Sequence, residues 1–378
     1  MIIGIDARFF GPRGKGIGRY TQKLIENLEE IDKQNQYLIF LRKENWDDFQ
    51  PFSPNFKKVL ADYKWYSVKE QIFMPFAIRR YKVDLMHFPH FNVPIFYFGK
   101  FVVTIHDLIL RHFPTRRAST LGPVLYRLKN LAYQIVIRLA VRRSEKIITV
   151  SDYVKRDIAG SFKVEPQKII VAYEGKPEKE LKSKTSDTKS LQNYNIQKPY
   201  LLYVGNAYPH KNLEKLAGAF DILVSRDRIP LQLVFVGEHD YFYKWFKNYL
   251  AERFFHLEKA IIFTEFITDS MLADIYNNAS LYVFPSLCEG FGLPPLEAMA
   301  HGVPVVSSNA TCLPEILGEA AIYFNPLDVK DMAGKIRRVI KSQNLRQVLV
   351  SRGFEQIKKY SWQKMAEETL AIYKIIRY

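Results

Sequence analysis

Two glutamates in the last third of the chain have the residue type and spacing of ligand-binding groups. Glu289 and Glu297 are separated by seven residues, and Gly290 and Gly292 lie between them. Glycine lets the backbone turn sharply and approach a ligand closely. A carboxylate accepts hydrogen bonds from two neighbouring hydroxyl groups, so the pattern suits a ligand that carries hydroxyls.

The residues around this loop predict a strand before it and a helix after it. Residues 281–285 form an apolar run, Pro294 and Pro295 suit the first turn of a helix, and Gly302 suits its end. The start of a helix attracts anions through its N–H groups and its dipole, so we expect a diphosphate there. A carboxylate repels a diphosphate, so Glu297 either binds sugar hydroxyls or stabilises the start of its helix.

The segment at residues 284–302 resembles the E-x7-E motif of retaining glycosyltransferases of family 4, which have the GT-B fold. Further segments similar to motifs of this family lie at residues 4–8, 14–20, 104–108, 147–157, 204–212 and 309–315. The resemblance covers nearly the whole chain. It implies transfer of a sugar from a nucleotide diphosphate sugar to a glycan acceptor, with retention of configuration.

Within this family, residues 209–212 and 289–297 look most like bacterial polysaccharide and O-antigen mannosyltransferases. That resemblance implies GDP-mannose as the donor, a lipid-linked glycan as the acceptor and a role in cell-surface polysaccharide synthesis. A UDP-sugar donor is the alternative, because enzymes of the family share these motifs while using UDP-sugars.

The resemblance also implies roles for single residues around the motif. Glu297 would hold the ribose hydroxyls, and Glu289 would contact hydroxyls of the transferred sugar. The backbone N–H groups of Phe291, Gly292 and Leu293 would face the diphosphate or the sugar, in agreement with the helix-start argument.

The charge of the leaving diphosphate calls for a fixed cation, and Lys211 matches the family position for it. Taken alone, Lys211 would be a solvated loop lysine. Family members commonly carry an arginine five residues earlier, where this chain has Asn206; Arg19 is a candidate to compensate. Gly16, in a G-x-G-x-G run, is assigned to the donor's phosphates, although isolated glycines more often form a turn.

His106 follows an apolar strand pattern, where a lone histidine is more often a packed core residue. Its match to the family's His-Asp motif implies a hydrogen bond to the transferred sugar. Retention in the family is usually attributed to front-face attack, so no general base is assigned. The sequence has no D-x-D triad and its histidines lack metal-ligand spacing, so we expect no metal and no other cofactor.

Short apolar runs alternate with helical patterns in two series, which is the rhythm of parallel sheets. We expect strands at residues 1–5, 37–41, 83–88, 102–105, 146–150, 200–204, 231–236, 260–264, 281–285 and 303–307. The predicted fold class is α/β. With the resemblance, it is GT-B: two Rossmann-like, doubly wound parallel-sheet domains that face a central cleft.

We expect an N-terminal, acceptor-side domain at residues 1–178, a polar linker at 179–198 and a C-terminal, nucleotide-sugar donor domain at 199–360. A helix at 361–378, capped by Ser361, either packs back on the N-terminal domain or is an ordinary terminal helix of the second domain.

The 378 residues include 55 Lys and Arg and 39 Asp and Glu, a formal net charge of +16 that favours an acidic partner. Residues 51–150 hold 17 basic and 5 acidic side chains, among aromatic and aliphatic residues. The basic residues include Arg79, Arg80, Lys82, Arg111, Arg116, Arg117, Arg127, Lys129, Arg138, Arg142 and Arg143. This composition favours an anionic membrane surface as partner; a solvated basic face is the alternative.

Two cysteines, Cys288 and Cys312, exclude a disulfide scaffold and favour a reducing compartment. No signal-peptide pattern opens the sequence and no long uncharged apolar run occurs, so we expect a cytoplasmic protein, peripheral on the inner face of the cell membrane. The other function classes are a non-catalytic nucleotide-sugar-binding module and a basic nucleic-acid-binding protein. No zinc-finger spacing or RNP-like motif favours nucleic acid as a partner.

Overall fold

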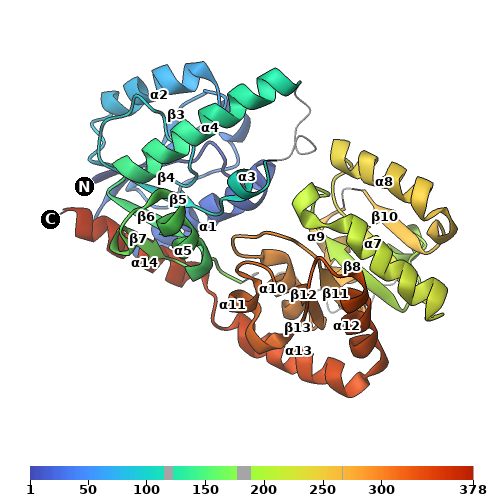
Figure 1. Cartoon of the computed structure of the whole chain (residues 1–378). Coiled ribbons are helices and arrows are strands. Elements are labelled where there is room, and N and C mark those ends of the chain that lie inside the picture. Colours follow the sequence, from blue (N-terminus) through green and yellow to red (C-terminus); the bar gives the residue numbers. More distant parts are fainter. Residues whose placement is uncertain (115–121, 177–188, 266, 378) are drawn as a thin grey trace. The chain divides into compact units, whose positions relative to one another are not determined.

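The computed structural model describes residues 1–114, 122–176, 189–265 and 267–377, which divide into two units (Figure 1). Of these residues, the N-terminal unit contains 1–112, 122–175 and 361–377, and the C-terminal unit contains the others. The chain therefore returns to its first unit at its end.

The N-terminal unit contains a sheet of seven strands in the order β3-β2-β1-β4-β5-β6-β7. The strands are β1 (Ile2–Asp6), β2 (Gln36–Leu41), β3 (Phe56–Leu60), β4 (Leu85–Phe88), β5 (Phe101–Ile105), β6 (Lys146–Thr149) and β7 (Ile169–Val171). All neighbouring strands in it run parallel. Its central strands are buried on both faces, which explains why they are almost wholly apolar.

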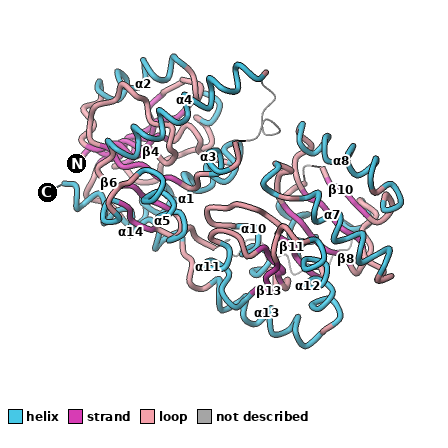
Figure 2. Tube along the Cα trace, in the orientation of Figure 1, coloured by secondary structure: helices cyan, strands magenta, loops and turns pink. Residues whose placement is uncertain are grey.

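Helices cover both faces of this sheet (Figure 2). They are α1 (Lys15–Ile31), α2 (Val68–Arg80), α3 (Ile109–His112), α4 (Pro123–Arg143), α5 (Asp152–Phe162) and α14 (Trp362–Arg377). Side chains of α2, α4 and α5 share one hydrophobic core with Met86, Phe88 and Val103. His87 and Thr104 alternate with those residues along their strands, so they point to the opposite face, where α1 packs against α14.

The last helix is joined to the N-terminal unit by a buried polar contact. The Tyr373 hydroxyl lies 2.5 Å from His87 Nδ1, and His87 Nε2 lies 2.8 Å from the Thr104 hydroxyl. Burial lowers the pKa of His87 to about 3, so its ring is neutral at physiological pH. Ser361 accepts a hydrogen bond from the Lys364 N–H, which confirms Ser361 as the cap of α14.

The C-terminal unit contains a six-stranded sheet in the order β10-β9-β8-β11-β12-β13, again with parallel pairings. Its strands are β8 (Tyr200–Val204), β9 (Gln232–Val236), β10 (Ile261–Thr264), β11 (Leu281–Phe284), β12 (Val305–Ser308) and β13 (Ala321–Phe324). Its helices are α6 (Lys189–Asn193), α7 (Leu213–Asp221), α8 (Tyr241–Arg253), α9 (Asp269–Asn278), α10 (Leu293–Ala300), α11 (Leu313–Leu317), α12 (Val329–Lys341) and α13 (Gln343–Ile357).

The predicted class, α/β with two doubly wound parallel sheets, is confirmed, and each predicted strand overlaps an observed one. The described part of the predicted linker is folded and partly buried. Residues 177–188 lie outside the described residues, whereas 189–198 include α6 and the buried side chains of Leu191 and Ile196. No helix in the described part of the chain has the length and apolarity needed to cross a bilayer.

The expected glycine loop near the N-terminus is instead the start of a helix. A 3-10 turn covers Pro12–Gly14, and α1 begins at Lys15, so Gly16 and Gly18 are helical. A Cβ atom at Gly18 would lie 2.1 Å from the Gly11 carbonyl oxygen, whereas a Cβ atom at Gly16 would meet nothing within 4 Å. Close packing therefore requires the glycine at 18, and no contact requires the one at 16.

We expect Gly18→Ala to lower the free energy of unfolding by about 1–3 kcal/mol, because the backbone around Phe9–Gly11 must move to admit the methyl group. Gly16→Ala, two residues earlier in α1, is the matched control and should leave stability unchanged or raise it by up to about 1 kcal/mol. Thermal unfolding followed by circular dichroism measures both. Equal midpoints for the two variants would contradict the packing argument.

Candidate active site

The predicted site residues of the C-terminal unit lie on two loops that follow neighbouring strands. β8 ends at Val204 and leads into the loop that carries Asn206 and Lys211, and β11 ends at Phe284 and leads into the loop that carries Glu289. β8 and β11 are adjacent in the sheet. The carboxyl ends of adjacent parallel strands share one edge, which is where doubly wound sheets bind ligands.

The structure brings Lys211 and Glu289 together. Lys211 Nζ lies 2.5 Å from Glu289 Oε1, and the two side chains are only 14% and 11% exposed. Lys211 Nζ also lies 5.7 Å from the centre of the Phe284 ring. A charge withdrawn this far from water needs a partner, so each of the two side chains fixes the other.

Hydrogen bonds between the two loops hold this pair in place. Asn212 has a left-handed backbone (φ 61°), and its side-chain amide donates to the carbonyls of Pro285 (3.1 Å) and Pro326 (2.8 Å). The Leu287 N–H donates to the His210 carbonyl at 2.7 Å. Asn212 is thus a positioning residue whose importance the sequence signalled only through its place beside Lys211.

A third segment supports the loop from behind. The Glu289 N–H donates to the Thr311 hydroxyl at 3.1 Å. The thiol of Cys312 donates to the carbonyls of Glu289 and Phe291, each at 3.3 Å. Burial raises the pKa of the Cys312 thiol well above its ordinary value, so the thiol stays protonated and keeps donating. The sequence marked residues 309–315 as a motif without indicating this role.

α10 begins at the glycine loop, as the sequence predicted. Gly292 has φ 102° and precedes the first helical residue, Leu293, while the proline pair occupies the first turn. A Cβ atom at Gly292 would lie 3.0 Å from a methyl carbon of Leu313, in a backbone conformation that side chains rarely adopt. The ring of Phe291 is buried against Tyr360, with centroids 5.3 Å apart, and this contact anchors the loop.

Glu297 lies deeper in the helix than the sequence suggested. It is the fifth residue of α10, and the first turn contains no acidic residue. Charge–dipole stabilisation falls off within the first turn, so capping does not explain Glu297. Its carboxylate is 9% exposed and accepts a hydrogen bond from the Tyr276 hydroxyl at 3.2 Å.

Asn206 shapes its own loop. Its side-chain oxygen accepts a hydrogen bond from the Tyr208 N–H at 3.3 Å, and its carbonyl accepts one from the Tyr203 hydroxyl at 2.7 Å. The amide therefore supports the turn that leads to Lys211 and brings no positive charge.

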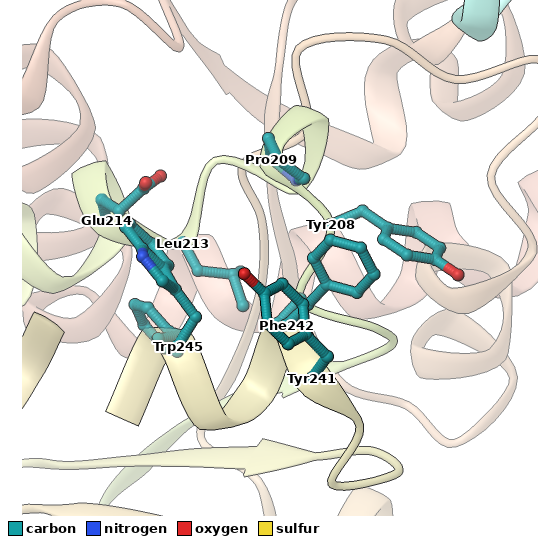
Figure 3. A pocket seen from close by; sticks show the side chains of 9 residues that line it. Tyr208, Pro209, Leu213, Glu214, Tyr241, Phe242 and Trp245 are labelled. Atoms are coloured by element: carbon teal, nitrogen blue, oxygen red, sulfur yellow. The ribbon is translucent and has the colours of Figure 1, made fainter. Parts of the chain in front are cut away.

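The loop that carries Asn206 also lines a small cavity (Figure 3). Its volume is about 50 Å³, and it is lined by Ala207, Tyr208, Pro209, Leu213, Glu214, Tyr241, Phe242, Trp245 and Phe246. Ligand pockets measure roughly 300–1,000 Å³, so this cavity does not hold a nucleotide sugar.

The predicted site residues of the N-terminal unit are Gly16 and His106, and their surroundings differ. Gly16 is exposed in the first turn of α1. His106 follows β5, and both of its ring nitrogens are occupied: Nδ1 lies 3.2 Å from the Glu174 carboxylate and Nε2 lies 2.9 Å from the Pro89 carbonyl. A hydrogen bond from His106 to a sugar would require one of these contacts to break.

Both partners of His106 are acceptors, so they favour the protonated ring, which donates from both nitrogens. Burial lowers its pKa, but the hydrogen bond and charge of Glu174 and the Pro89 carbonyl outweigh burial, and the pKa is raised above 6.5. Glu174 was missed from the sequence because it lies 68 residues beyond His106. Among the described residues, no group of three or more His, Cys, Asp or Glu side chains could hold a metal ion.

Two family profiles match the chain, one for each half. The profile described as Glycosyltransferase Family 4 matches residues 14–176, and that described as Glycosyl transferases group 1 matches residues 186–356.

Two relatives that match over nearly their whole length are both described as O-antigen chain mannosyltransferases. The chain is 28% identical over 383 residues to O-antigen chain mannosyltransferase B of Escherichia coli, covering 96% of each protein. It is 26% identical over 351 residues to O-antigen chain mannosyltransferase RfbU of Salmonella typhimurium, covering 90% of each.

Solved structures show the fold. Sucrose-phosphate synthase from Thermosynechococcus elongatus is similar with a TM-score of 0.77 and 20% identity, over 100% of this chain and 99% of that one. Anabaena Alr3699/HepE in complex with UDP and glucose is similar with a TM-score of 0.72 and 15% identity, over 99% of each chain.

We expect Glu174→Gln to lower the pKa of His106, because the ring would lose its charged partner while burial still opposes its protonation. A raised pKa stabilises the fold at low pH, so the wild-type contribution is complete below about pH 6.5 and is lost as pH rises through the raised pKa. The variant should lack this part of the pH dependence of stability.

NMR titration of the histidine resonances measures the pKa, with His106→Gln to assign the signal. Glu165→Gln, which changes an exposed glutamate of the same unit, is the control. An unshifted His106 titration in Glu174→Gln would show that the carboxylate does not set the charge of the ring.

Proposed function

The chain belongs to glycosyltransferase family 4 and has the GT-B fold, and on that premise we propose that it transfers mannose from GDP-mannose to a lipid-linked glycan, with retention of configuration and without a metal ion. The observation that carries the proposal is the Lys211–Glu289 pair at the carboxyl edge of the C-terminal sheet, beside the start of α10.

The pair supplies both charges that such a transfer needs. Negative charge builds on the diphosphate as its bond to the anomeric carbon breaks, and a nearby ammonium group stabilises it. Lys211 takes that part when donor is bound. Glu289 then exchanges its lysine partner for the hydroxyls of the transferred sugar, and Glu297 accepts hydrogen bonds from the ribose.

The attacking group comes from the acceptor. Its hydroxyl oxygen forms the new bond to the anomeric carbon on the face from which the diphosphate leaves, and its proton passes to the departing phosphate oxygen. The protein contributes position and charge, and no protein group is consumed.

The names of the two full-length relatives support mannose and a role in O-antigen synthesis. A UDP-sugar donor remains the second candidate, because the Anabaena protein of similar fold is seen with UDP and glucose.

We expect Lys211→Met and Glu289→Gln each to reduce kcat by about 10²-fold, because each removes a fixed charge or acceptor from the transition state. Glu297→Gln should chiefly raise the KM for the donor, by about tenfold, because it weakens charge-assisted hydrogen bonds to the ribose. Glu319→Gln, in the same unit with a side chain 86% exposed, is the control.

Transfer should be assayed with GDP-mannose, UDP-glucose, UDP-galactose and UDP-N-acetylglucosamine, with and without EDTA. NMR of the product's anomeric proton gives the configuration. Turnover of a UDP-sugar alone would overturn GDP-mannose, an inverted product would overturn retention, and inhibition by EDTA would overturn metal independence. Full activity of folded Glu289→Gln would remove the assigned role of Glu289.

We further propose that the N-terminal unit docks on an anionic membrane surface through one face, called here the apolar–basic face. Its exposed apolar side chains come from α2, α4 and the segment before β5: Val68, Ile72, Phe73, Phe76, Phe96, Phe98, Val124, Leu128, Leu131 and Ile135. Its exposed basic side chains are Lys69, Arg79, Arg80, Arg127, Lys129, Arg138 and Arg142.

The face is continuous because its parts are tied together. α2 and α4 pack on the same hydrophobic core. The Ile95 N–H donates to the Gln71 side chain of α2 at 2.8 Å, and Arg143 of α4 donates to the Ile95 carbonyl at 2.7 Å. α4 has no acidic residue, and Glu70, the acidic residue of α2, is buried. An apolar surface with basic side chains and no exposed carboxylate on its helices suits acidic lipid.

Part of the predicted basic set does not contribute to this face. Arg111 donates to Gln134 and lies over the Phe162 ring, and Arg143 is held by the Ile95 and Tyr97 carbonyls. Arg116 and Arg117 lie outside the described residues.

We expect Phe76→Ser with Phe98→Ser to weaken binding to phosphatidylglycerol-containing vesicles by at least about tenfold, because burial of each aromatic side chain contributes roughly 1.5–3 kcal/mol. Phe76 is 66% and Phe98 82% exposed. Phe255→Ser, which changes a 72%-exposed phenylalanine of the C-terminal unit, is the control. Vesicle co-sedimentation measures binding. Equal, negligible binding to anionic and neutral vesicles would contradict the membrane proposal.

A further inference from the structure

We propose that a group of aromatic rings at the carboxyl edge of the N-terminal sheet binds a hexopyranose ring of the acceptor glycan. Tyr66 is the stacking surface and His90 the hydrogen-bond donor of this subsite. The proposal rests on the proposed function for the identity of the acceptor, and on the N-terminal unit alone for its geometry.

The rings come from loops that follow three strands of one sheet. Phe9 follows β1, Trp65 and Tyr66 follow β3, and His90 and Phe91 follow β4. All these strands run parallel, so their following loops gather at the same edge. Ligands of doubly wound sheets bind outside this edge.

The five rings form one connected row. Trp65 stacks on Phe9 with centroids 4.1 Å apart, and Phe9 lies 5.2 Å from His90. His90 lies 4.0 Å from Phe91 and 6.1 Å from Tyr66, nearly at right angles to the latter. Phe9 and Phe91 are the buried members of the row, His90 is half-buried and Tyr66 is 54% exposed. Burial thus fixes Phe9 and Phe91, and the ring of Tyr66 is exposed to solvent.

Tyr66 is held open by an unusual backbone conformation. Its φ is 59°, in the left-handed region, where a bulky side chain is a rare outlier. Such a conformation persists only when surrounding contacts enforce it, and outliers of this kind cluster at functional sites. The enforcing contact is a hydrogen bond of 2.8 Å from the Tyr66 N–H to Glu70 Oε2.

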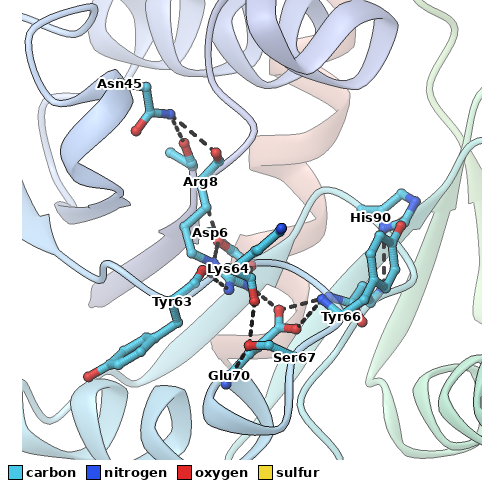
Figure 4. Close-up of polar contacts among 11 residues, drawn as sticks. Asp6, Arg8, Asn45, Tyr63, Lys64, Tyr66, Ser67, Glu70 and His90 are labelled. Atoms are coloured by element: carbon cyan, nitrogen blue, oxygen red, sulfur yellow. Dashed lines mark hydrogen bonds and ion pairs between the residues drawn. The ribbon is translucent and has the colours of Figure 1, made fainter.

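Glu70 belongs to a buried network that joins the three loops (Figure 4). Its Oε1 accepts hydrogen bonds from Arg8 (2.6 Å) after β1 and from Asn92 (2.7 Å) after β4, while Oε2 holds Tyr66 after β3. Arg8 also pairs with Asp6 at 2.6 Å and donates to the Tyr63 carbonyl at 3.1 Å. The side chains of Arg8 and Glu70 are fully buried.

The network fixes the rings without offering a charge to a ligand. Arg8 is satisfied by two carboxylates and a carbonyl, so it is not placed to attract a phosphate. Removing one member of a buried ion pair is costly, which explains how the network can maintain the strained loop. A rigid aromatic surface above a network whose cation is already paired favours an uncharged ligand.

His90 supplies the polar group of the subsite. The Asn92 N–H donates to His90 Nδ1 at 3.3 Å, so the proton of the neutral ring is on Nε2. Burial and the neighbouring charges of His106 and Arg8 lower the pKa of His90 to about 3, which keeps the ring neutral. The described residues supply Nε2–H with no hydrogen-bond acceptor, and a sugar hydroxyl is an acceptor of suitable chemistry.

An aromatic face beside a neutral N–H donor matches a pyranose, which presents C–H groups on one face and hydroxyls at its rim. The apolar face lies on Tyr66, and a rim hydroxyl accepts from His90. Because Tyr66 supplies stacking and His90 a hydrogen bond, substitutions of the two residues should have different effects.

Steady-state kinetics should be measured with GDP-mannose and an acceptor glycan at varied concentrations. Tyr66→Ala is expected to raise the KM for the acceptor by about tenfold, and Tyr66→Phe to stay within about twofold of wild type, because stacking needs only the ring. His90→Phe keeps a ring in the row and removes the donor, so it should raise the acceptor KM by about fivefold. The donor KM and the rate of donor hydrolysis without acceptor should not change in any of them. Tyr81→Ala, at a 42%-exposed tyrosine of the same unit, is the control.

An unchanged acceptor KM in folded Tyr66→Ala would overturn the subsite, as would an equal rise in the donor KM. Saturation-transfer NMR with methyl α-D-mannopyranoside and a mannose trisaccharide tests binding without turnover. If no nucleotide sugar is turned over, the proposed function fails, and the NMR still decides on the subsite. Loss of saturation transfer in Tyr66→Ala but not in Tyr66→Phe supports it, and equal signals in both variants overturn it.

Discussion

Opposite charges withdrawn from water hold the loops at the carboxyl edge of the C-terminal sheet in shape. Lys211 and Glu289 lie on different loops, 78 positions apart in the chain, and neither could stay largely buried without the other. Their contact sets the distance between the loops after β8 and β11, and the Asn212 and Cys312 contacts make that arrangement rigid. Under the proposed function, a ligand with a diphosphate at one end and hydroxyls at the other would replace each partner of the pair without leaving either charge unpaired.

The N-terminal unit solves the same problem of buried charge in a different way. Arg8 pairs with both Asp6 and Glu70 in the interior, and the surface above them consists of aromatic rings and a neutral histidine. Glu174 raises the pKa of His106, in the loop after β5, and so favours its charged form. The two sheet edges therefore differ in chemistry: exchangeable charge in the C-terminal unit, and fixed, uncharged surface around Tyr66 in the N-terminal unit.

Local patterns predicted much of this molecule, and contacts between distant segments could not be predicted. Apolar runs indicated each central strand, whereas three other strands of the described residues were not predicted. They are β3, which contains Lys57 and Lys58, β7, which has only three residues, and β13. Glycine and proline indicated the start of α10 correctly. The same reasoning failed at Gly16, because a helix that begins at Lys15 depends on the packing of Gly14 and Gly18 against Phe9. The partners of His106 and Arg8 lie 68 and 62 residues away, beyond the reach of any spacing rule.

The bond between His87 and Tyr373 has a consequence for synthesis of the protein. The two residues are separated by 286 positions, so the N-terminal sheet leaves the ribosome long before the helix that covers one of its faces exists. At roughly 5–20 residues per second, translation leaves that face uncovered for about 15–60 seconds. The first unit can therefore close only after α14 has been made, because Tyr373 supplies the partner of His87.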